Sequence, residues 1–230
     1  MSQDSEKQLA AAAAVKYVQN GMRVGLGSGS TSATAVRMLG ERIRREGLQV
    51  VGVPTSQATR DVAIEVGVPL AEDLSQFELD VAFDGADEAT RAGWLIKGGG
   101  GAMLRERIVA AAAATFIVMV DSSKMVDRLG NYPLPVEVFP LGFRNVERRL
   151  AQMGAEVRLR IKNGAPLITD EGNQILDCRF PAEMYDDPHT LATRLRSMTG
   201  VADHGLFLDM TARLIIARGE HVEELAFPRQ

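Results

Sequence analysis

Apolar runs and helically spaced apolar residues alternate along the first 130 residues of the chain. Short apolar runs predict strands at 22–26, 49–53, 79–83, 94–96 and 115–120. Helical spacing predicts helices over 4–19, from the loop at 27–31 to Gly47, over 56–66 and over about 102–113. Strands and helices that alternate in this way form parallel sheets. We therefore expect an α/β fold with a Rossmann-like, mainly parallel sheet and helices on both faces.

The pattern changes after Pro133. Strands at 135–139, 156–161, 174–178 and 201–205 and helices at 144–153 and 189–197 follow the order β-α-β-β-α-β. This order is ferredoxin-like, and Asn163-Gly164 is a hairpin signal within it. The apolar strand at 214–217 should return to the first domain. The predicted organisation is an α/β catalytic domain at 1–130 and 207–230, with a small α+β domain at 131–206.

Composition narrows the class of protein. The 230 residues are 46% apolar, which is enough for a sizeable core, and the formal charge of −4 offers no basic field for nucleic acid. Cys178 is the single cysteine, so we expect a reducing compartment. The apolar run at 110–120 is too short to span a bilayer, and the N-terminus has no signal-peptide pattern. We expect a soluble cytoplasmic protein without nucleic-acid or membrane partners.

A run of four glycines at 98–101 stands out against this background. Lys97 precedes the run and Glu106 follows it, so a cation, backbone donors and a potential base lie in one short segment. Each glycine would cost about 0.5–1 kcal/mol in a helix or strand, so the run belongs where the backbone approaches something closely. A flexible loop is the alternative. The run is not a P-loop, because its lysine precedes the glycines.

Four predicted strands end in clusters of small, polar or charged residues: 27–31, 84–88, the run after Ile96, and 121–124. If these strands share one parallel sheet, all four clusters lie along one edge, where such sheets bind ligands. The segment 25–31 lacks the third glycine of the dinucleotide fingerprint, and no acid follows the second strand. It is instead a candidate for binding one phosphate at a helix N-terminus, against the alternative of a capped turn.

The polar side chains leave several alternatives open. Asp84 and Asp87 are metal ligands, turn residues or an acid–base pair. Glu106 is either a base or a surface glutamate paired with a neighbouring arginine. The three histidines lie far from the glycine motifs and are expected to be surface or structural: His189, His204 and His221.

These motifs together resemble one family. The segments 25–31 (Gly-Leu-Gly-Ser-Gly-Ser-Thr), 83–88 (Phe-Asp-Gly-Ala-Asp-Glu), 97–100 with Arg105-Glu106, and 121–124 (Asp-Ser-Ser-Lys) resemble type A ribose-5-phosphate isomerase. Segment 132–138 is similar to the family's entry into its small domain. The resemblance covers nearly the whole chain in order. It departs at Ser28, where the family often has threonine, although serine keeps the hydroxyl.

The resemblance implies interconversion of D-ribose 5-phosphate and D-ribulose 5-phosphate in the non-oxidative pentose phosphate pathway, without metal or organic cofactor, by a homodimer or homotetramer. It places Glu106 at the general-base position. Its substrate-binding positions are Ser28, Gly29, Ser30, Thr31, Asp84, Gly85, Ala86, Asp87, Lys97, Gly98, Gly99, Gly100 and Lys124.

The chemistry of the reaction suits these residue types. One carboxylate, Glu106, can move a proton between C1 and C2. Lys97 and the glycine N–H groups can stabilise the enediolate, and Asp84 or Asp87 can help to open the sugar ring. Lys124 and the loop at 28–31 would hold the phosphate.

Three other functions are weighed against the isomerase. A sugar-phosphate deaminase would use a histidine for ring opening, and no histidine lies near the motifs. A CoA transferase would need room for CoA, whereas the turn at Ser28 suits a small phosphate. A sugar-phosphate-sensing module of a transcription regulator would need a helix-turn-helix segment and a basic face, which the short, acidic N-terminal helix does not supply.

Overall fold

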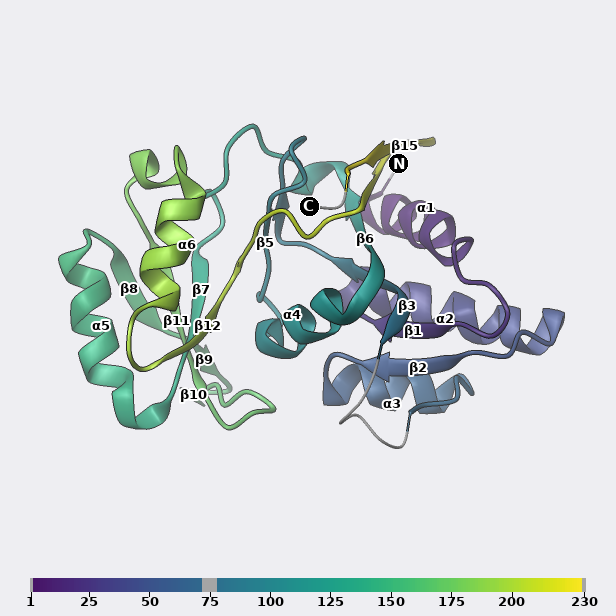
Figure 1. Cartoon of the computed structure of the whole chain (residues 1–230), viewed down its shortest axis with the longest axis horizontal. Helices are drawn as coiled ribbons and strands as arrows, with labels where there is room; N and C mark the ends of the chain where they lie inside the picture. Colours follow the sequence, from purple (N-terminus) through teal and green to yellow (C-terminus); the bar gives the residue numbers. More distant parts are fainter. Residues whose placement is uncertain (1, 72–77, 229–230) are drawn as a thin grey trace. The chain divides into compact units, whose positions relative to one another are not determined.

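The computed structural model describes residues 2–71 and 78–228, and the chain divides into two compact units (Figure 1). The first unit comprises Met1–Ala86, Arg105–Met125 and Asp209–Gln230. The second comprises Asp87–Leu104 and Val126–Leu208. Residues 87–104, 126–130 and 207–208 group with the second unit, whereas the sequence led us to expect them in the α/β domain.

A six-stranded sheet forms the centre of the first unit, in the order β15-β14-β6-β3-β1-β2. Its strands are β1 (Arg23–Leu26), β2 (Val51–Pro54), β3 (Leu79–Gly85), β6 (Ala113–Asp121), β14 (Arg213–Arg218) and β15 (His221–Ala226). All neighbours are parallel except β15, which pairs antiparallel with β14. The mainly parallel sheet is confirmed, and so is the return of the strand near 214–217. The edge strand β15 was not predicted.

Helices cover both faces of this sheet: α1 (Gln3–Val15), α2 (Gly29–Glu46), α3 (Gln57–Glu65) and α4 (Met103–Ala112) (Figure 1). Val24 and Leu26 of β1 share one core cluster with residues of α1, α2 and α3. Gly25 between them faces the other side, because successive strand residues alternate. A Cβ on Gly25 would lie 2.5 Å from Val109 Cγ1 of α4, so this glycine allows α4 to pack closely on the sheet.

The helix ends follow local hydrogen bonding. Gly47 ends α2 in the left-handed region with φ +68°, as the sequence predicts. The first helix ends at Val15 and not near residue 19, because the Tyr17 and Val18 N–H groups turn back onto carbonyls three residues earlier. The chain therefore leaves the helix through a tight turn before β1.

β1 lies at the point where the chain changes its direction across the sheet. From β1 the sheet extends to β2 on one side and to β3 on the other, so the strand order reverses at this point. Ligands in open α/β sheets bind beyond the carboxyl ends of the strands at such a switch point. The clusters that follow β1, β3 and β6 lie along this edge, since these three strands are parallel neighbours.

The fourth predicted strand does not belong to this sheet. β5 (Leu95–Ile96) lies in the second unit, in a three-stranded antiparallel sheet between β4 (Glu88–Ala89) and β13 (Leu206–Phe207). A hairpin turn causes this arrangement: Thr90 N–H donates to Trp94 O at 2.9 Å, and Gly93 has φ +80°. The expectation that β5 shares the parallel sheet was wrong, because two-residue strands give no pattern from which a pairing partner can be read.

The rest of the second unit has the predicted order. β7 (Leu134–Val138), α5 (Phe143–Gln152), β8 (Glu156–Leu159), β11 (Gln174–Arg179), α6 (Pro188–Arg196) and β12 (Val201–His204) form an antiparallel sheet in the order β12-β7-β11-β8 with two helices. β9 (Ile161–Lys162) and β10 (Ala165–Pro166) form the predicted hairpin, with positive φ at Asn163 and Gly164. The first unit also contains a short 3₁₀ helix, η1 (Ser122–Lys124). The second unit contains two more, η2 (Pro140–Gly142) and η3 (Ala182–Tyr185).

One face of the small sheet carries the core of the second unit. Val136 and Val138 of β7 pack with Val146 and Leu150 of α5. Cys178 belongs to the same cluster and is fully buried, so its prediction as a small buried hydrophobe is confirmed. Pro135 and Glu137 alternate with the core residues and point to the opposite face. His204 is buried and accepts a hydrogen bond from Leu206 N–H at 3.2 Å, as expected of a structural histidine.

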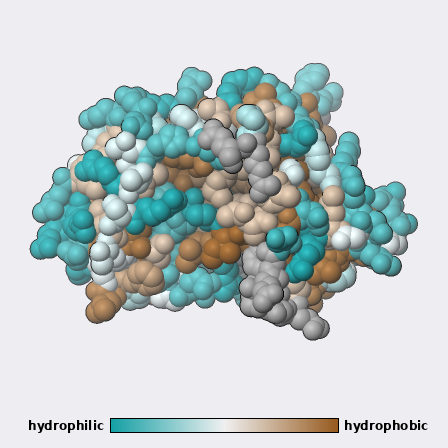
Figure 2. All heavy atoms as spheres, in the orientation of Figure 1, coloured by the Kyte–Doolittle hydropathy of each residue, from teal (hydrophilic) through white to brown (hydrophobic). Residues whose placement is uncertain are grey.

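Hydrophilic residues cover much of the outer surface on the face drawn in Figure 2. Among the residues that the structure describes, no helix is long and apolar enough to cross a membrane.

Candidate functional site

The loop after β1 forms the N-terminus of α2. Ser28 is the residue before the helix, and Gly29 begins it with φ +85°. The Ser28 hydroxyl does not cap the helix but lies 2.7 Å from Thr55 Oγ1, whose own hydroxyl donates to Leu26 O at 3.0 Å. N–H groups in the first turn of a helix have no intrahelical partner, and they make such a turn an anion-binding site. Ser30 and Thr31 lie in this first turn.

Asp84 holds this loop from the end of β3. Its side chain is 2% exposed, and Oδ1 accepts from Ser28 N–H at 3.0 Å, the Ser32 hydroxyl at 2.9 Å and Gly85 N–H at 2.7 Å. The carboxylate is therefore fixed by three donors at the switch point of the sheet. Among the described residues, no group of three or more His, Cys, Asp and Glu side chains is arranged to hold a metal ion.

Gly27 makes this arrangement possible. Its N–H donates to Phe83 O at 2.9 Å, which draws the loop onto β3. A Cβ at this position would lie 2.2 Å from Asp84 Oδ1 and 2.5 Å from Phe83 O, so any side chain here would force its neighbours to shift. The sequence pattern around Gly27 only suggested a phosphate loop, whereas the structure shows that this glycine makes room for Asp84.

The turn that carries Lys124 is tied to the N-terminal helix. The Glu6 carboxylate accepts from Ser122 N–H and the Ser122 hydroxyl, both at 2.9 Å, and from Gly219 N–H at 2.8 Å. These backbone donors hold the pKa of Glu6 below its ordinary value. Asp121 caps the same turn by accepting from Ser123 N–H at 3.0 Å. Lys124, partly buried at the end of η1, thus projects from a fixed turn.

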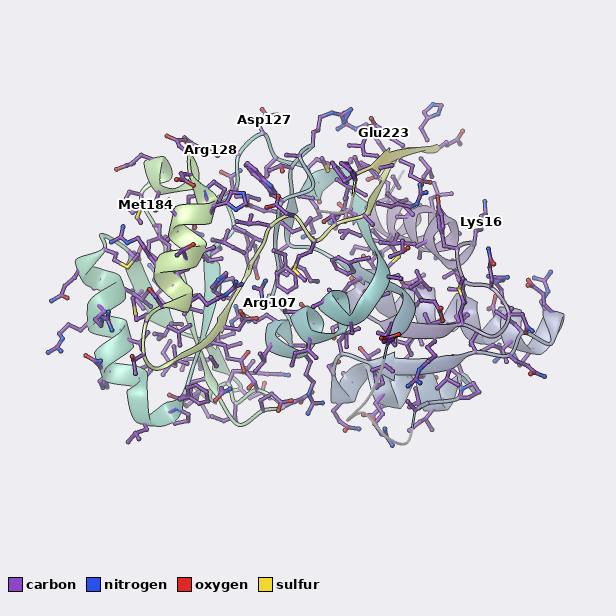
Figure 3. The ribbon with its side chains drawn as sticks, in the orientation of Figure 1. Lys16, Arg107, Asp127, Arg128, Met184 and Glu223 are labelled. Atoms are coloured by element: carbon purple, nitrogen blue, oxygen red, sulfur yellow. The ribbon has the colours of Figure 1, made fainter. Side chains whose placement is uncertain are left out.

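Glu106 lies in the first turn of α4 and is 5% exposed. Its burial excludes the alternative of a surface glutamate. Arg107, labelled in Figure 3, lies on the same helix and directs Nη1 to the sulfur of Met210 at 3.7 Å.

In the second unit, Lys97 follows β5 and is 3% exposed. Its N–H donates to Gly205 O at 2.9 Å, and its ammonium lies 5.5 Å from the centre of the Phe207 ring. The backbone of Lys97 is therefore fixed by Gly205, which lies between β12 and β13. Its cation lies over an aromatic face, as lysine often does when it is partly desolvated.

The glycine run is an ordered turn. Gly98 and Gly101 have φ +102° and +85°, and Gly101 N–H donates to Gly98 O at 3.0 Å. Gly99 N–H donates to Asp87 Oδ2 at 2.7 Å, and a Cβ on Gly99 would lie 2.5 Å from Asp87 Oδ1. The run binds Asp87 through its backbone and has no room for side chains at 98 and 99. The flexible-loop alternative does not describe this segment.

Two side chains beside this turn, Tyr132 and Arg160, were not predicted as site residues from the sequence. Tyr132 places its hydroxyl 2.8 Å from where a Cβ on Gly99 would stand. Arg160 donates from Nη1 to Gly98 O at 2.7 Å and to Gly99 O at 3.0 Å. Arg160 follows β8 in the chain, far from every motif, and no local pattern marks it.

Glu88, the last residue of the predicted cluster at 84–88, has a structural position. It is 3% exposed and accepts from Gly130 N–H at 2.8 Å and from Tyr132 N–H. Burial raises the pKa of Glu88 above its ordinary value, although these N–H groups oppose the shift. The carboxylate holds the loop that leads into β7.

Each unit thus contains part of the predicted site. In the first, the structure brings Ser28 together with Asp84 and Gly85. In the second, it brings Asp87 together with Gly98 and Gly99, and Lys97 precedes them directly. Ala86 ends the first of the three segments that make up the first unit, and Gly100 is exposed at the tip of the glycine turn.

Known proteins resemble this chain over nearly its whole length. The family described as "Ribose 5-phosphate isomerase A (phosphoriboisomerase A)" matches residues 51–221. The chain is 46% identical to ribose-5-phosphate isomerase A of Sphingopyxis alaskensis, over 95% of both chains. It is 41% identical to ribose-5-phosphate isomerase A 1 of Oceanobacillus iheyensis, over 96% of this chain and 97% of that one.

Solved structures give the same result. Ribose 5-phosphate isomerase A of Methanocaldococcus jannaschii superposes with a TM-score of 0.93 at 40% identity, over 98% of this chain and 100% of that one. A D-ribose-5-phosphate isomerase in complex with phospho-erythronic acid gives a TM-score of 0.94 at 38% identity, over 99% and 100% of the two chains. The chain belongs to the ribose-5-phosphate isomerase A family.

Proposed function

We propose that the chain, a ribose-5-phosphate isomerase of the pentose phosphate pathway, moves a proton between C1 and C2 of its sugar phosphate with Glu106 as the base. The single observation that carries this proposal is the burial of Glu106 in the first turn of α4, which follows the glycine turn. A carboxylate withdrawn from water can take the C2 proton of ribose 5-phosphate and return it to C1. The product is ribulose 5-phosphate.

Lys97 and the glycine turn stabilise the enediolate that forms between the two proton transfers. Negative charge develops on the substrate oxygens, and donors fixed in advance stabilise such charge strongly in a site with little water. Lys97 is 3% exposed, and its backbone is held by Gly205. The relative bound to phospho-erythronic acid supports this proposal, because a carboxylate beside a phosphorylated chain resembles the charge of the enediolate.

Asp87 is the better candidate for opening the sugar ring. Asp84 already accepts three hydrogen bonds on one oxygen and is almost fully buried. Asp87 is only half-buried and holds Gly99 N–H. In Asp87→Asn, ring opening should limit the rate, so the isotope effect of deuterium at C2 of ribose 5-phosphate should fall towards one. An isotope effect unchanged from wild type would refute this role.

The loop at 28–31 and Lys124 bind the phosphate. The first-turn N–H groups of α2 and an ammonium on a fixed turn are suited to one dianion. Ser28 takes part through the geometry of the loop, since its hydroxyl is bound to Thr55 and its N–H donates to Asp84. This explains why serine can replace the family's threonine at this position.

The proposed base is tested by measuring ribulose 5-phosphate formation by wild type, Glu106→Gln and the control Glu65→Gln, which changes an exposed glutamate of α3. A chelator is present throughout. We expect wild type and Glu65→Gln to be fully active, and Glu106→Gln to lose about 10²- to 10⁴-fold in kcat. Full activity of Glu106→Gln would refute the mechanism, and loss of wild-type activity on chelation would refute the metal-free reaction.

We further propose that the protein acts in the cytoplasm as a homodimer or homotetramer. The single cysteine, which is buried and reduced, and the family resemblance support these two statements. Light scattering on the purified chain tests the second: a monomeric mass at micromolar concentration would contradict it.

A further inference from the structure

We propose that Arg160 is a positioning residue for the reaction: it holds the carbonyls of the glycine turn so that the Gly100 N–H is directed to the substrate. The inference rests on the proposed role of the glycine turn in binding the enediolate. It concerns a residue that follows β8 and belongs to none of the four motifs.

The Arg160 guanidinium binds the glycine turn on one edge and Asp177 on the other. Nη1 of Arg160 donates to Gly98 O at 2.7 Å and to Gly99 O at 3.0 Å. On its other edge, Nε donates to Asp177 Oδ2 at 2.9 Å and Nη2 donates to Asp177 Oδ1. A bidentate pair of this kind fixes the plane of the guanidinium. Asp177 of β11 thus orients Arg160 towards the glycines.

The backbone of Arg160 is fixed as well. Its N–H donates to Ile175 O, and its own carbonyl accepts from Leu167 N–H, both at 2.9 Å. The side chain is 12% exposed. Burial alone would lower the pKa of Arg160, but the bonds and charge of Asp177 outweigh it and keep the pKa above its ordinary value. The group is a permanent, immobile cation behind the turn.

The geometry of the peptide bond sets the direction of the N–H groups in the glycine turn. In a trans peptide the C=O of one residue and the N–H of the next point in opposite directions. In the peptide from Gly98 to Gly99, the carbonyl is bound to Arg160 and the N–H is bound to Asp87 at 2.7 Å. In the next peptide Arg160 binds the carbonyl of Gly99, so the N–H of Gly100 must point away from the guanidinium.

The surroundings of Gly100 are open. Gly100 is exposed, and a Cβ there would meet nothing within 4 Å. A backbone donor on an open side, with its peptide polarised by a guanidinium on the carbonyl, is suited to an anionic oxygen. Arg160 therefore acts through Gly100, and it fixes the donor before substrate arrives.

A matched pair of variants tests the inference. Arg160→Met removes the cation and keeps much of the volume. Arg158→Met is its control, because Arg158 is an exposed arginine two positions earlier that pairs with Glu156. We expect Arg160→Met to lose about 100-fold in kcat, the cost of misplacing a catalytic group by about 1 Å, while Arg158→Met keeps the wild-type rate. Equal kcat values in these two variants would overturn the proposal.

Chemical rescue separates positioning from a role in folding alone. In Arg160→Ala, guanidinium ion should restore part of kcat, whereas urea at the same concentration should not, because only the cation replaces the lost group. Rescue by both solutes or by neither, with the variant folded by circular dichroism, would contradict the proposal. Glu106→Gln is measured alongside: activity there would refute the proposed base, whereas an inactive Glu106→Gln beside an active Arg160→Met would refute only the role of Arg160.

Discussion

Gly27→Ala should lower the activity of the enzyme about 100-fold, because the new methyl group displaces the neighbouring Asp84 carboxylate. The new Cβ would stand 2.2 Å from Asp84 Oδ1, 2.3 Å from its Cγ and 2.5 Å from Phe83 O. Ordinary contact begins at 3.4 Å, so Oδ1 must move by 3.4 − 2.2 = 1.2 Å. The Phe83 carbonyl belongs to β3 and cannot yield, because it is part of the sheet.

This displacement breaks the bonds of Asp84 to Ser28 N–H and to the Ser32 hydroxyl. A shift of about 1 Å at a reacting or binding group costs about 100-fold in rate, or about 2.7 kcal/mol in the activation free energy. Overpacking should also lower the free energy of unfolding by about 1–3 kcal/mol. The variant should therefore fold, but with kcat/KM reduced about 100-fold.

Gly47→Ala is the control for lost stability. Gly47 has φ +68° and open space around its Cβ position, so alanine there costs about 1–2 kcal/mol in backbone strain without touching Asp84. The assay measures kcat and KM for ribose 5-phosphate together with urea unfolding of both variants. If Gly27→Ala is as active as Gly47→Ala, the close approach of Gly27 to Asp84 does not matter for the reaction.

Three further changes follow from the same contacts. Lys124→Ala should raise KM by about 10- to 100-fold with little change in kcat, since it loses a charge-assisted bond to the phosphate; a fall in kcat alone would contradict this. Glu6→Gln weakens the ties to Ser122 and Gly219, so it should raise KM less than Lys124→Ala does, and an unchanged KM would show that the turn does not depend on Glu6. Burial raises the pKa of Glu137 above 4.5, and Asp203 adds to the shift. The folded protein therefore binds the proton of the Glu137 carboxyl more tightly than the unfolded chain does. Its free energy of unfolding falls as the pH rises from 4.5 to the pKa of Glu137 in the folded protein. The Tm of Glu137→Gln relative to that of wild type should therefore increase over this pH interval. A constant difference in Tm would contradict the assignment.

Much of the fold could be read from periodicity. The helix that Gly47 ends and the hairpin at Asn163-Gly164 were predicted because their signals are local: a left-handed glycine and a pair of positive-φ residues. The β-α-β-β-α-β order of the second unit was also predictable, since each of its elements is long enough to show a period.

The sequence could not reveal pairings between distant short segments. β4, β5 and β13 have two residues each, and their antiparallel sheet depends on contacts between residues near 89, 95 and 206. The edge strand β15 is largely exposed on both faces, so it lacks the apolar run that marks a strand.

The residues of the candidate site could likewise be predicted only where the sequence signal is local. Lys97, Glu106 and Asp84 could be named as candidates from the sequence, because they stand in or near segments rich in glycine. Arg160 and Asp177 were missed, because only the folded sheet brings them to the glycine turn. Residues that position others carry no local sequence signal, since their role depends on a partner far away in the chain.

The central claim is that the Glu106 carboxylate removes the proton from C2. The most direct test follows the C2–deuterium bond of [2-²H]ribose 5-phosphate by NMR with wild type and with Glu106→Gln. We predict that wild type breaks this bond as fast as it forms ribulose 5-phosphate, whereas Glu106→Gln leaves it intact over the same time. Loss of the C2 deuterium at the wild-type rate in Glu106→Gln would contradict the account.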